Sequence, residues 1–203
     1  MNRPTIGVLA VQGAFAEHEK RLEELGASYV ELRQAADLNQ HLDGLVLPGG
    51  ESTAQDKIIG DLGMRDLLIG LIEGGIPVLA TCAGMVLLAE HLEGFGDLRS
   101  QMPVNRLAIS GLGTMPISVC RNAYGRQLGS FNTRAEFKGI GEVPMTFIRA
   151  PYVTCVGEGV DILAEVNERA VAVRFGSQIA TSFHPELDSD VSIHSLFLDL
   201  CIA

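Results

Sequence analysis

The stretch that decides the fold class of this chain is IPVLATCAGMVLLAEHL, at residues 76–92. Its first part, 76–80, is an apolar run that predicts a buried strand, and the pattern of 83–92 predicts a helix. Cys82 lies at the bend, with small neighbours. A sharp strand-to-helix turn holds a nucleophile out in a strained conformation, and the helix N-terminus behind it favours thiolate over thiol. The alternative is a buried cysteine in front of a core helix, because free cysteines are among the most buried residues.

The chain around this stretch alternates apolar runs with helical patterns. Strands are predicted at 6–11, 29–32 and 44–47, and helical segments at 14–25 and 52–73. Such βαβ alternation indicates an α/β fold of three layers, with a mostly parallel sheet and helices on both faces. Beyond Gly111 the pattern changes to short runs that predict strands, some of them antiparallel, followed by a final helix at 191–201. These runs are 115–119, 145–148, 162–166, 170–175 and 178–183.

A second candidate for chemistry is the segment Ser182-Phe183-His184-Pro185-Glu186. It ends an extended run, and residues two apart in extended chain point the same way, so His184 and Glu186 are expected to share a face. A carboxylate beside an imidazole accepts the Nδ1 proton and fixes the tautomer. A lone His-x-Glu pattern is common by chance. Together with a cysteine at an elbow it indicates thiol-based acyl transfer.

A third candidate is LVLPGGEST, at residues 45–53. An apolar strand runs into Gly49 and Gly50, and Ser52 and Thr53 suit a helix N-cap. Consecutive glycines let backbone N–H groups approach a ligand, as an oxyanion hole requires. Pro-Gly-Gly alone is more typical of a plain connection between a strand and a helix. In parallel sheets, however, ligands gather at the carboxyl ends of strands, where these glycines, Cys82 and His184 are all expected.

Composition limits the classes of function. With 203 residues, 47% of them hydrophobic, and no internal repeat or linker, the chain is expected to form one domain, 1–203, with a sizeable core. The net charge of −10 and the lack of a Lys/Arg run make nucleic acid and anionic membranes poor partners. The cysteines show no metal-binding spacing and are interpreted as reduced thiols of a cytoplasmic protein. No apolar run approaches membrane-spanning length, and the short run at 6–11 is not interpreted as a signal peptide.

Six motifs occur in the order known from one family. They are VQGAFAEH (11–18), PGGEST (48–53), TCAG (81–84), RNAYGRQ (121–127), FIRAP (147–151) and FHPEL (183–187). The chain thus resembles the glutaminase subunits of pyridoxal 5′-phosphate synthase, a family of class I, triad-type glutamine amidotransferases with a flavodoxin-like fold. The resemblance spans the chain from about residue 6 to the final helix. GGEST, RNAYGRQ and IRAP distinguish this family from other triad amidotransferases.

The resemblance implies roles for individual residues. Cys82 would be the nucleophile, His184 the base and Glu186 its orienting acid. Backbone N–H groups of Gly49 and Ala83 would form the oxyanion hole. The residues implied to bind L-glutamine are Gly50, Glu51, Ser52, Arg121, Ile148 and Arg149. Without the resemblance, the two arginines would be interpreted as surface residues.

The resemblance also implies the reaction and the partner. L-Glutamine would be hydrolysed to glutamate and ammonia without a metal or organic cofactor. The ammonia would pass to a (β/α)₈-barrel synthase subunit that makes pyridoxal 5′-phosphate, and the glutaminase would be weak until docked on it. The alternatives are a triad amidotransferase serving another acceptor, a non-enzymatic glutamine-binding subunit, and a cysteine hydrolase or chaperone-like protein of similar fold.

Other positions receive no chemical role from the sequence. The remaining histidines, His18, His41, His91 and His194, are interpreted as surface or helix residues, and Cys120 and Cys155 as core residues of strands. Ala80 stands where the family usually has glycine, Asn132 where it often has an acid, and residues 112–116 depart from the family pattern. The loop before Gly111 looks longer than in short members. These departures concern the shape of the pocket rather than the triad.

Overall fold

The computed structural model describes residues 3–93, 110–121 and 130–202. Five strands form its parallel core in the spatial order β2-β1-β3-β4-β12, and every adjacent pair in this order is parallel. The five strands are β1 (Thr5–Leu9), β2 (Ser28–Leu32), β3 (Gly44–Leu47), β4 (Val78–Thr81) and β12 (Gln178–Thr181). The parallel sheet that the alternating pattern predicts is therefore confirmed.

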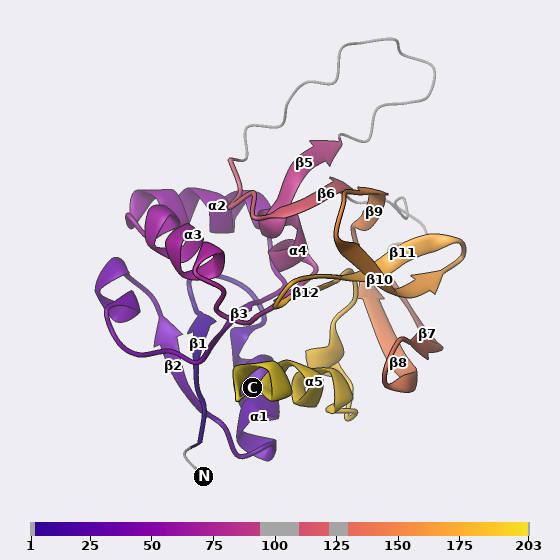
Figure 1. Ribbon diagram of the computed structural model, residues 1–203, viewed down its shortest axis with the longest axis horizontal. Helices are drawn as coiled ribbons and strands as arrows, with labels where there is room; N and C mark the ends of the chain where they lie inside the picture. The colour runs from indigo at the N-terminus through magenta and orange to yellow at the C-terminus, as the bar shows by residue number, and fades with distance from the viewer. Residues whose placement is uncertain (1–2, 94–109, 122–129, 203) are drawn as a thin grey trace.

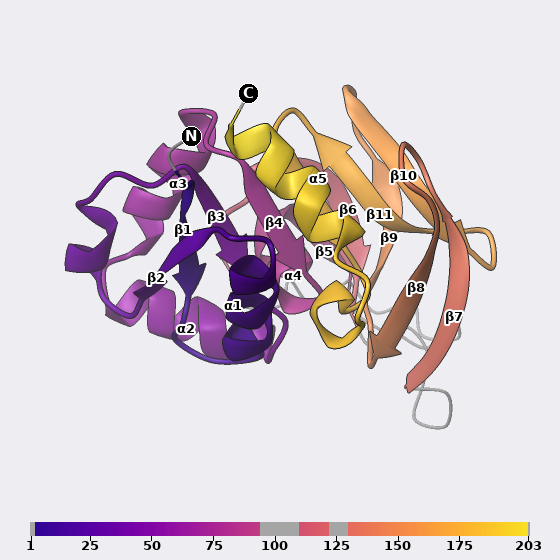
Figure 2. The same cartoon turned by 90° about the horizontal axis from the view of Figure 1, so that it is seen from below.

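The sheet continues beyond β12 as a largely antiparallel extension, in the order β12-β11-β9-β6-β5, and β10 pairs with β11. The strands of this extension are β5 (Ala89–Glu93), β6 (Met115–Cys120), β9 (Tyr152–Val156), β10 (Val160–Val166) and β11 (Arg169–Phe175). A separate antiparallel hairpin consists of β7 (Ser130–Phe137) and β8 (Gly141–Ile148). Figure 2 shows this hairpin at the side of the molecule remote from β2.

Helices cover both faces of the parallel core, as the three-layer prediction requires (Figures 1 and 2). On one face lie α1 (Phe15–Glu24) and α5 (Ser192–Cys201), and on the other α2 (Ser52–Asp61), α3 (Arg65–Glu73) and α4 (Ala83–Leu88). Two short 3₁₀ helices, η1 (Ala35–Leu38) and η2 (Pro185–Leu187), complete the described elements. None of the helices in the described ranges is long and apolar enough to cross a membrane.

The two faces of the sheet pack into two apolar cores. In β3, Val46 packs in the core that contains Phe197 of α5, whereas Leu45 and Leu47 pack in the core that contains Ile59 of α2. Side chains alternate between the faces of a strand, so a strand covered on both sides is apolar at every position. This explains why β3 and β4 read as continuous apolar runs.

The helix predicted at 83–92 is wrong in its second half. Helix α4 ends at Leu88, and the following residues form β5, which pairs with β6. The carbonyl of Leu87 accepts the backbone N–H of Leu112 at 2.6 Å, so the returning chain caps the helix. Ala89 is then extended, with φ −61° and ψ 135°. Strand pairing has overridden the local helical pattern here.

Three further expectations are corrected. The run predicted as a strand at 178–183 ends at Thr181. Strands β7 and β9 were not among the predicted runs, although β7 alternates Phe131, Thr133, Ala135 and Phe137 at every second position. Cys155, on β9, is exposed rather than in the core, whereas Cys120 is buried as predicted. The predicted long loop before Gly111 falls largely outside the described residues.

Candidate active site

The elbow predicted at Cys82 is present. Cys82 lies between β4 and α4 with φ 48° and ψ −97°, a conformation that non-glycine residues rarely adopt. Its backbone N–H donates to the carbonyl of Thr181 at 2.7 Å, and its own carbonyl accepts the N–H of Val86 in the first turn of α4. Hydrogen bonds on both sides therefore hold the strained residue in place.

Small residues make this elbow possible. A Cβ at Gly84 would lie 2.1 Å from the carbonyl oxygen of Leu47, so only glycine lets α4 approach the end of β3 this closely. Ala83 is buried beside it, and Ala80 is fully buried in β4. The methyl group of Ala80, which departs from the family pattern, is thus accommodated within the core.

Strand register brings the segment that contains His184 next to the elbow at Cys82. Thr181 pairs with Thr81 at the carboxyl ends of β12 and β4, so the chain after β12 emerges beside the elbow. His184 follows three residues later, and its backbone N–H donates to the carbonyl of Thr146 on β8 at 2.9 Å. Residues separated by about half of the chain meet because parallel neighbouring strands end at the same edge.

His184 and Glu186 form a close pair, but not for the predicted reason. The chain is not extended there: η2 begins at Pro185, directly after His184. The turn of this 3₁₀ helix brings the Glu186 carboxylate back toward the ring, and Oε1 lies 2.6 Å from His184 Nδ1. Glu186 is 1% exposed, so the pair is shielded from water.

The environment of His184 favours its charged form. Burial acts to lower the pKa of His184, but hydrogen bonds with the Cys82 thiol and with Glu186 outweigh it and raise the pKa to about 10. Burial likewise acts to raise the pKa of Glu186, while His18 and His184 hold it below its usual value. A thiol, an imidazole and a carboxylate are thus linked in one chain of contacts, an arrangement that triad enzymes also have.

The raised pKa of His184 predicts a contribution to stability that depends on pH. The folded-state pKa, about 10, lies above the ordinary 6.5, so protonation stabilises the fold fully below pH 6.5 and loses its effect as the pH rises to 10. The difference in unfolding free energy between the wild type and His184→Gln should therefore shrink over this range. Denaturant unfolding at a series of pH values measures it. A constant difference would contradict an imidazolium in the folded protein.

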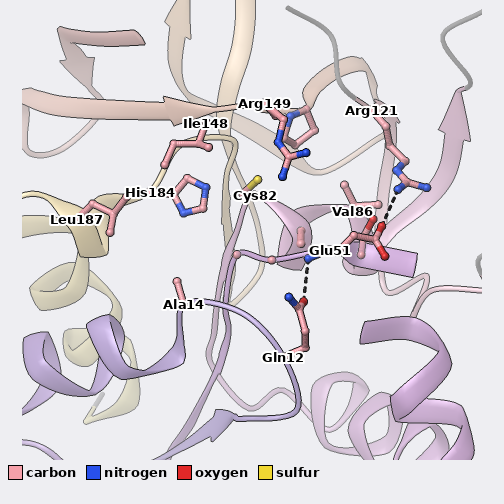
Figure 3. A pocket seen from close by; sticks show the side chains of 15 residues that line it. Gln12, Ala14, Glu51, Cys82, Val86, Arg121, Ile148, Arg149, His184 and Leu187 are labelled. Atoms are coloured by element: carbon pink, nitrogen blue, oxygen red, sulfur yellow. Dashed lines mark hydrogen bonds and ion pairs between the residues drawn. The ribbon is translucent and has the colours of Figure 1, made fainter. Parts of the chain in front are cut away.

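A cavity of about 480 Å³ opens in front of Cys82 and His184 (Figure 3). Ten of the eleven residues expected at the site line it: Gly49, Gly50, Glu51, Ser52, Cys82, Ala83, Arg121, Ile148, Arg149 and His184. Glu186 does not, because it lies behind His184. The other lining residues were not predicted from the sequence: Gln12, Ala14, Val86, Pro151 and Leu187. The VQGAFAEH motif was a signal for Gln12 and Ala14.

The two glycines at this cavity are required by close packing. A Cβ at Gly49 would lie 2.3 Å from His184 Cε1, and one at Gly50 would lie 2.5 Å from Oε1 of Gln12. The carbonyl of Gly49 accepts the backbone N–H of Ala14 at 2.9 Å. In a trans peptide the N–H points opposite to the carbonyl, so the N–H of Gly50 is directed away from Ala14.

Charged groups of both signs face the cavity. Glu51, rather than Ser52 or Thr53, is the N-cap of α2, and its carboxylate accepts the N–H groups of Thr53 and Ala54 at 3.0 and 2.7 Å. Burial acts against it, but these hydrogen bonds and Arg121 hold the pKa of Glu51 below its usual value. The distance between Nη2 of Arg121 and Oε1 of Glu51 is 3.2 Å.

Arg149 supplies a second cation at the cavity. It follows β8 with a φ of 44°, which is unusual for a non-glycine residue. Figure 3 shows its side chain directed into the cavity. Because Glu51 caps the N-terminus of α2 and Arg149 follows β8, an acid and a base approach the cavity from different elements. Such a site suits a small molecule that carries both an ammonium and a carboxylate group.

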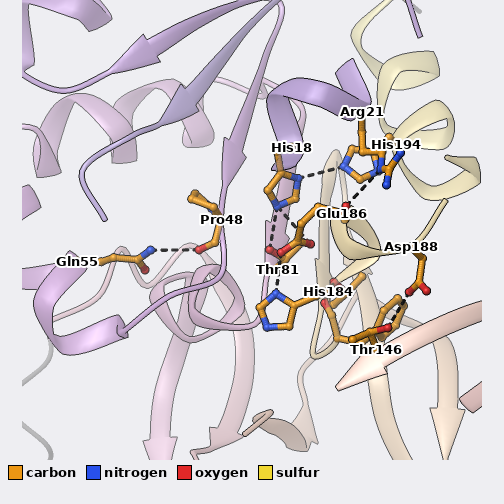
Figure 4. Close-up of polar contacts among 12 residues, drawn as sticks. His18, Arg21, Pro48, Gln55, Thr81, Thr146, His184, Glu186, Asp188 and His194 are labelled. Carbon is orange, nitrogen blue, oxygen red and sulfur yellow. Dashed lines mark hydrogen bonds and ion pairs between the residues drawn. The ribbon is translucent and has the colours of Figure 1, made fainter. Parts of the chain in front are cut away.

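Two histidines that the sequence left without a role lie behind the His184–Glu186 pair. His18 and His194 stand on helices, as expected, but both are fully buried rather than at the surface. His18 Nε2 lies 3.4 Å from Oε2 of Glu186 (Figure 4). His41 and His91 are exposed. Among the described residues, no cluster of His, Cys, Asp and Glu could hold a metal ion.

Comparisons with known proteins agree with this geometry. The chain matches the family described as the SNO glutamine amidotransferase family over residues 8–203. Pyridoxal 5′-phosphate synthase subunit PdxT of Desulfitobacterium hafniense (strain Y51) is 53% identical over 96% of this chain and 92% of its own length. PdxT of Haemophilus influenzae (strain PittEE) is 50% identical over 97% of each chain.

A solved structure is similar to this chain over almost its whole length. A crystal structure of a glutamine amidotransferase, 38% identical in sequence, covers 98% of this chain and 99% of its own, with a TM-score of 0.87. The elbow at Cys82, the His184–Glu186 pair and the charged cavity agree with these similarities. Because the similarity in sequence and fold extends over nearly the whole length, the chain belongs to the SNO glutamine amidotransferase family.

Proposed function

We propose that this chain, as one domain spanning residues 1–203, is the glutaminase subunit of a pyridoxal 5′-phosphate synthase. It hydrolyses L-glutamine to L-glutamate and ammonia and delivers the ammonia to the synthase subunit. The observation that carries the proposal is the meeting of the Cys82 elbow and the His184–Glu186 pair at a cavity rimmed by Glu51 and Arg149. The relatives named as PdxT subunits support the choice of this amidotransferase among others.

Glutamine binding uses the charges around the cavity. Arg121 and Arg149 attract the α-carboxylate, and Glu51 attracts the α-ammonium group. Backbone groups of Gly50 and Ser52 and the apolar surface of Ile148 complete the pocket. The side-chain amide of the substrate then points toward Cys82. Holding the reacting carbon next to the thiol supplies a large part of the rate enhancement.

The reaction proceeds through a thioester. The Cys82 thiolate attacks the amide carbon, and the carbonyl oxygen becomes an oxyanion. When the intermediate collapses, the C–N bond breaks and the leaving nitrogen takes a proton from His184, so ammonia departs. His184 next removes a proton from water, which attacks the thioester, and glutamate leaves as the thiolate is restored. Glu186 keeps His184 in the productive tautomer throughout.

Backbone N–H groups stabilise the oxyanion. One comes from Ala83, at the N-terminus of α4, and the other from the Gly49–Gly50 segment. The hydrogen bond from Ala14 to the carbonyl of Gly49 fixes one orientation of this peptide. Because glycine has no Cβ, rotation of the same peptide meets little steric resistance and costs mainly this hydrogen bond. Its orientation therefore provides a point at which a docked partner can control the reaction.

The partner in this proposal is a (β/α)₈-barrel synthase subunit, and the complex is cytoplasmic. All four cysteines of the chain are free, which suits a reducing compartment. The excess of acidic residues, with a net charge of −10, favours a protein partner over nucleic acid.

Partner docking is expected to raise turnover far more than it changes glutamine binding. One missing oxyanion donor costs roughly 10²–10³ in rate, enough to silence the isolated subunit if the Gly49–Gly50 peptide is misaligned. The test is steady-state glutamate release from the purified chain, alone and with a cognate barrel subunit. Full activity alone, unchanged by the partner, would point to a stand-alone glutaminase or to a different amidotransferase.

A further inference from the structure

A buried polar cluster lies behind the triad, outside the glutamine cavity. We call it the histidine cluster; it consists of His18 on α1, Thr81 at the end of β4 and His194 on α5, all of them 0% exposed. His18 Nδ1 lies 3.0 Å from His194 Nε2, and His18 Nε2 lies 3.1 Å from Thr81 Oγ1. Figure 4 shows these contacts converging with Glu186 on His18. The mechanism above uses none of the three residues.

The histidine cluster lies next to Oε2 of Glu186, the carboxylate oxygen that does not contact His184. Oε1 of Glu186 contacts His184, whereas Oε2 is buried and makes no hydrogen bond within the described part of the chain. His18 Nε2 lies 3.4 Å from Oε2. A buried carboxylate oxygen that lacks a donor is costly. His18 Nε2 is thus the group that stands in position to compensate it.

Proton counting identifies the tautomer of His18. With the proton on Nε2, His18 donates to Thr81 Oγ1 while the same N–H stands 3.4 Å from Oε2 of Glu186, and its Nδ1 accepts from Nε2 of His194. His194 Nδ1 is then an unprotonated nitrogen, and it has no hydrogen-bond partner among the described residues. With the proton on His18 Nδ1, a lone pair would face the carboxylate, and His194 would bury an unpaired N–H donor. The first arrangement is better because it leaves no buried N–H unpaired.

Helix α1 holds the same acid at a second point. Nε of Arg21, three residues after His18, donates to the backbone carbonyl of Glu186 at 3.2 Å. The charged or titratable groups that face Glu186 are therefore His184 from its own segment and His18 and Arg21 from α1. Burial lowers the pKa of His18 against the opposing effect of the Glu186 charge, which favours the neutral imidazole.

We propose that His18 is a positioning residue of the glutaminase reaction: neutral and protonated at Nε2, it holds Oε2 of Glu186 so that Oε1 stays on Nδ1 of His184. The inference rests on the proposed roles of Cys82, His184 and Glu186. A carboxylate released from His18 is free to turn away from His184, and the imidazole then loses its fixed tautomer. His18 itself touches neither the substrate nor the nucleophile.

Two variants of His18 test the role. His18→Leu removes the donor, and His18→Gln returns an amide N–H at the ε position. We expect His18→Leu to lower kcat for glutamine hydrolysis roughly tenfold to a hundredfold, the scale measured for the outer hydrogen-bond partners of metal-binding histidines, with KM unchanged. His18→Gln should recover most of this loss. Assays are run with the cognate synthase subunit present.

The pH profile separates positioning from packing. Without a donor on Oε2 the pKa of Glu186 rises, because hydrogen bonds to a carboxylate favour its charged form. The fall of kcat/KM on the acidic side of the pH profile, its acid limb, should therefore shift to higher pH in His18→Leu. In His18→Gln it should shift back to the wild-type position. The matched control is Gln178→Leu, which breaks partly buried hydrogen bonds with Thr114 at the opposite end of β12. It should lower stability without moving the acid limb.

The tautomer can be measured without any variant. Nitrogen-15 NMR of histidine-labelled protein should show His18 protonated at Nε2 and neutral across neutral pH. A proton on Nδ1, or a His18→Leu variant with wild-type kcat and an unmoved acid limb, would overturn the proposal, as would equal changes in Gln178→Leu. Failure of the proposed function looks different: Cys82→Ala would then stay active, whatever His18 does.

Discussion

Replacement of Cys82 by alanine or serine is expected to abolish glutaminase activity while the fold and partner binding persist. Among the described residues that line the cavity, Cys82 alone carries a thiol that can form the thioester. Loss of a nucleophile from a triad costs on the order of 10⁶ in kcat in a serine protease. The measurement is glutamate release with the synthase subunit present. Cys155→Ser is the matched control, because Cys155 is exposed and lies on β9, away from the cavity lining; it should keep wild-type activity.

Covalent labelling provides an independent check of the nucleophile. A glutamine-analogue electrophile such as a diazo-ketone should modify Cys82 and spare the other cysteines, as read by peptide mass spectrometry. Burial raises the pKa of Cys201 to about 12 and also raises the pKa of Cys120, so both thiols are poorly reactive at neutral pH. Labelling of another cysteine, together with an active Cys82→Ala variant, would end the assignment.

Loss of the base is expected to be nearly as damaging as loss of the nucleophile. His184→Asn removes both the partner of the Cys82 thiol and the donor of the proton to ammonia. Glu186→Gln should cost less, since the imidazole survives in a poorer tautomer population. In subtilisin, loss of the acid costs roughly 10⁴ in kcat, against roughly 10⁶ for the base. The same ranking is expected here.

These variants are compared by kcat and KM at saturating synthase subunit. Both should change kcat with little change in KM, because neither side chain is proposed to grip the α-amino acid end of glutamine. A double variant, Cys82→Ala with His184→Asn, should be no worse than either single one, since members of a triad act as a unit. Near-wild-type rates in both single variants would mean that residues 183–187 are only structural.

The elbow and the layer order could be predicted from the sequence because they follow from local patterns. Apolar runs of strand length, helical spacing and small residues around Cys82 each act over a few residues. They therefore predict the parallel core and the helix after Cys82 correctly. The same patterns failed at Ala89–Glu93, where pairing with β6 outweighed the helical pattern. Pairing with a distant strand leaves no signal in the local sequence.

The contacts among the site residues were decided by tertiary structure alone. The pairing of β4 with β12 brings His184 to Cys82, and the turn of η2, not an extended chain, brings Glu186 onto its ring. His18 offered no chemical signal, because its contacts with His194 and Glu186 join residues far apart in the chain. Local periodicity determines which elements form, whereas strand register and helix packing determine which side chains meet. The sequence by itself therefore determined the elbow at Cys82 and the class of fold, and only the packing of α1 and α5 behind the sheet determined what surrounds Glu186.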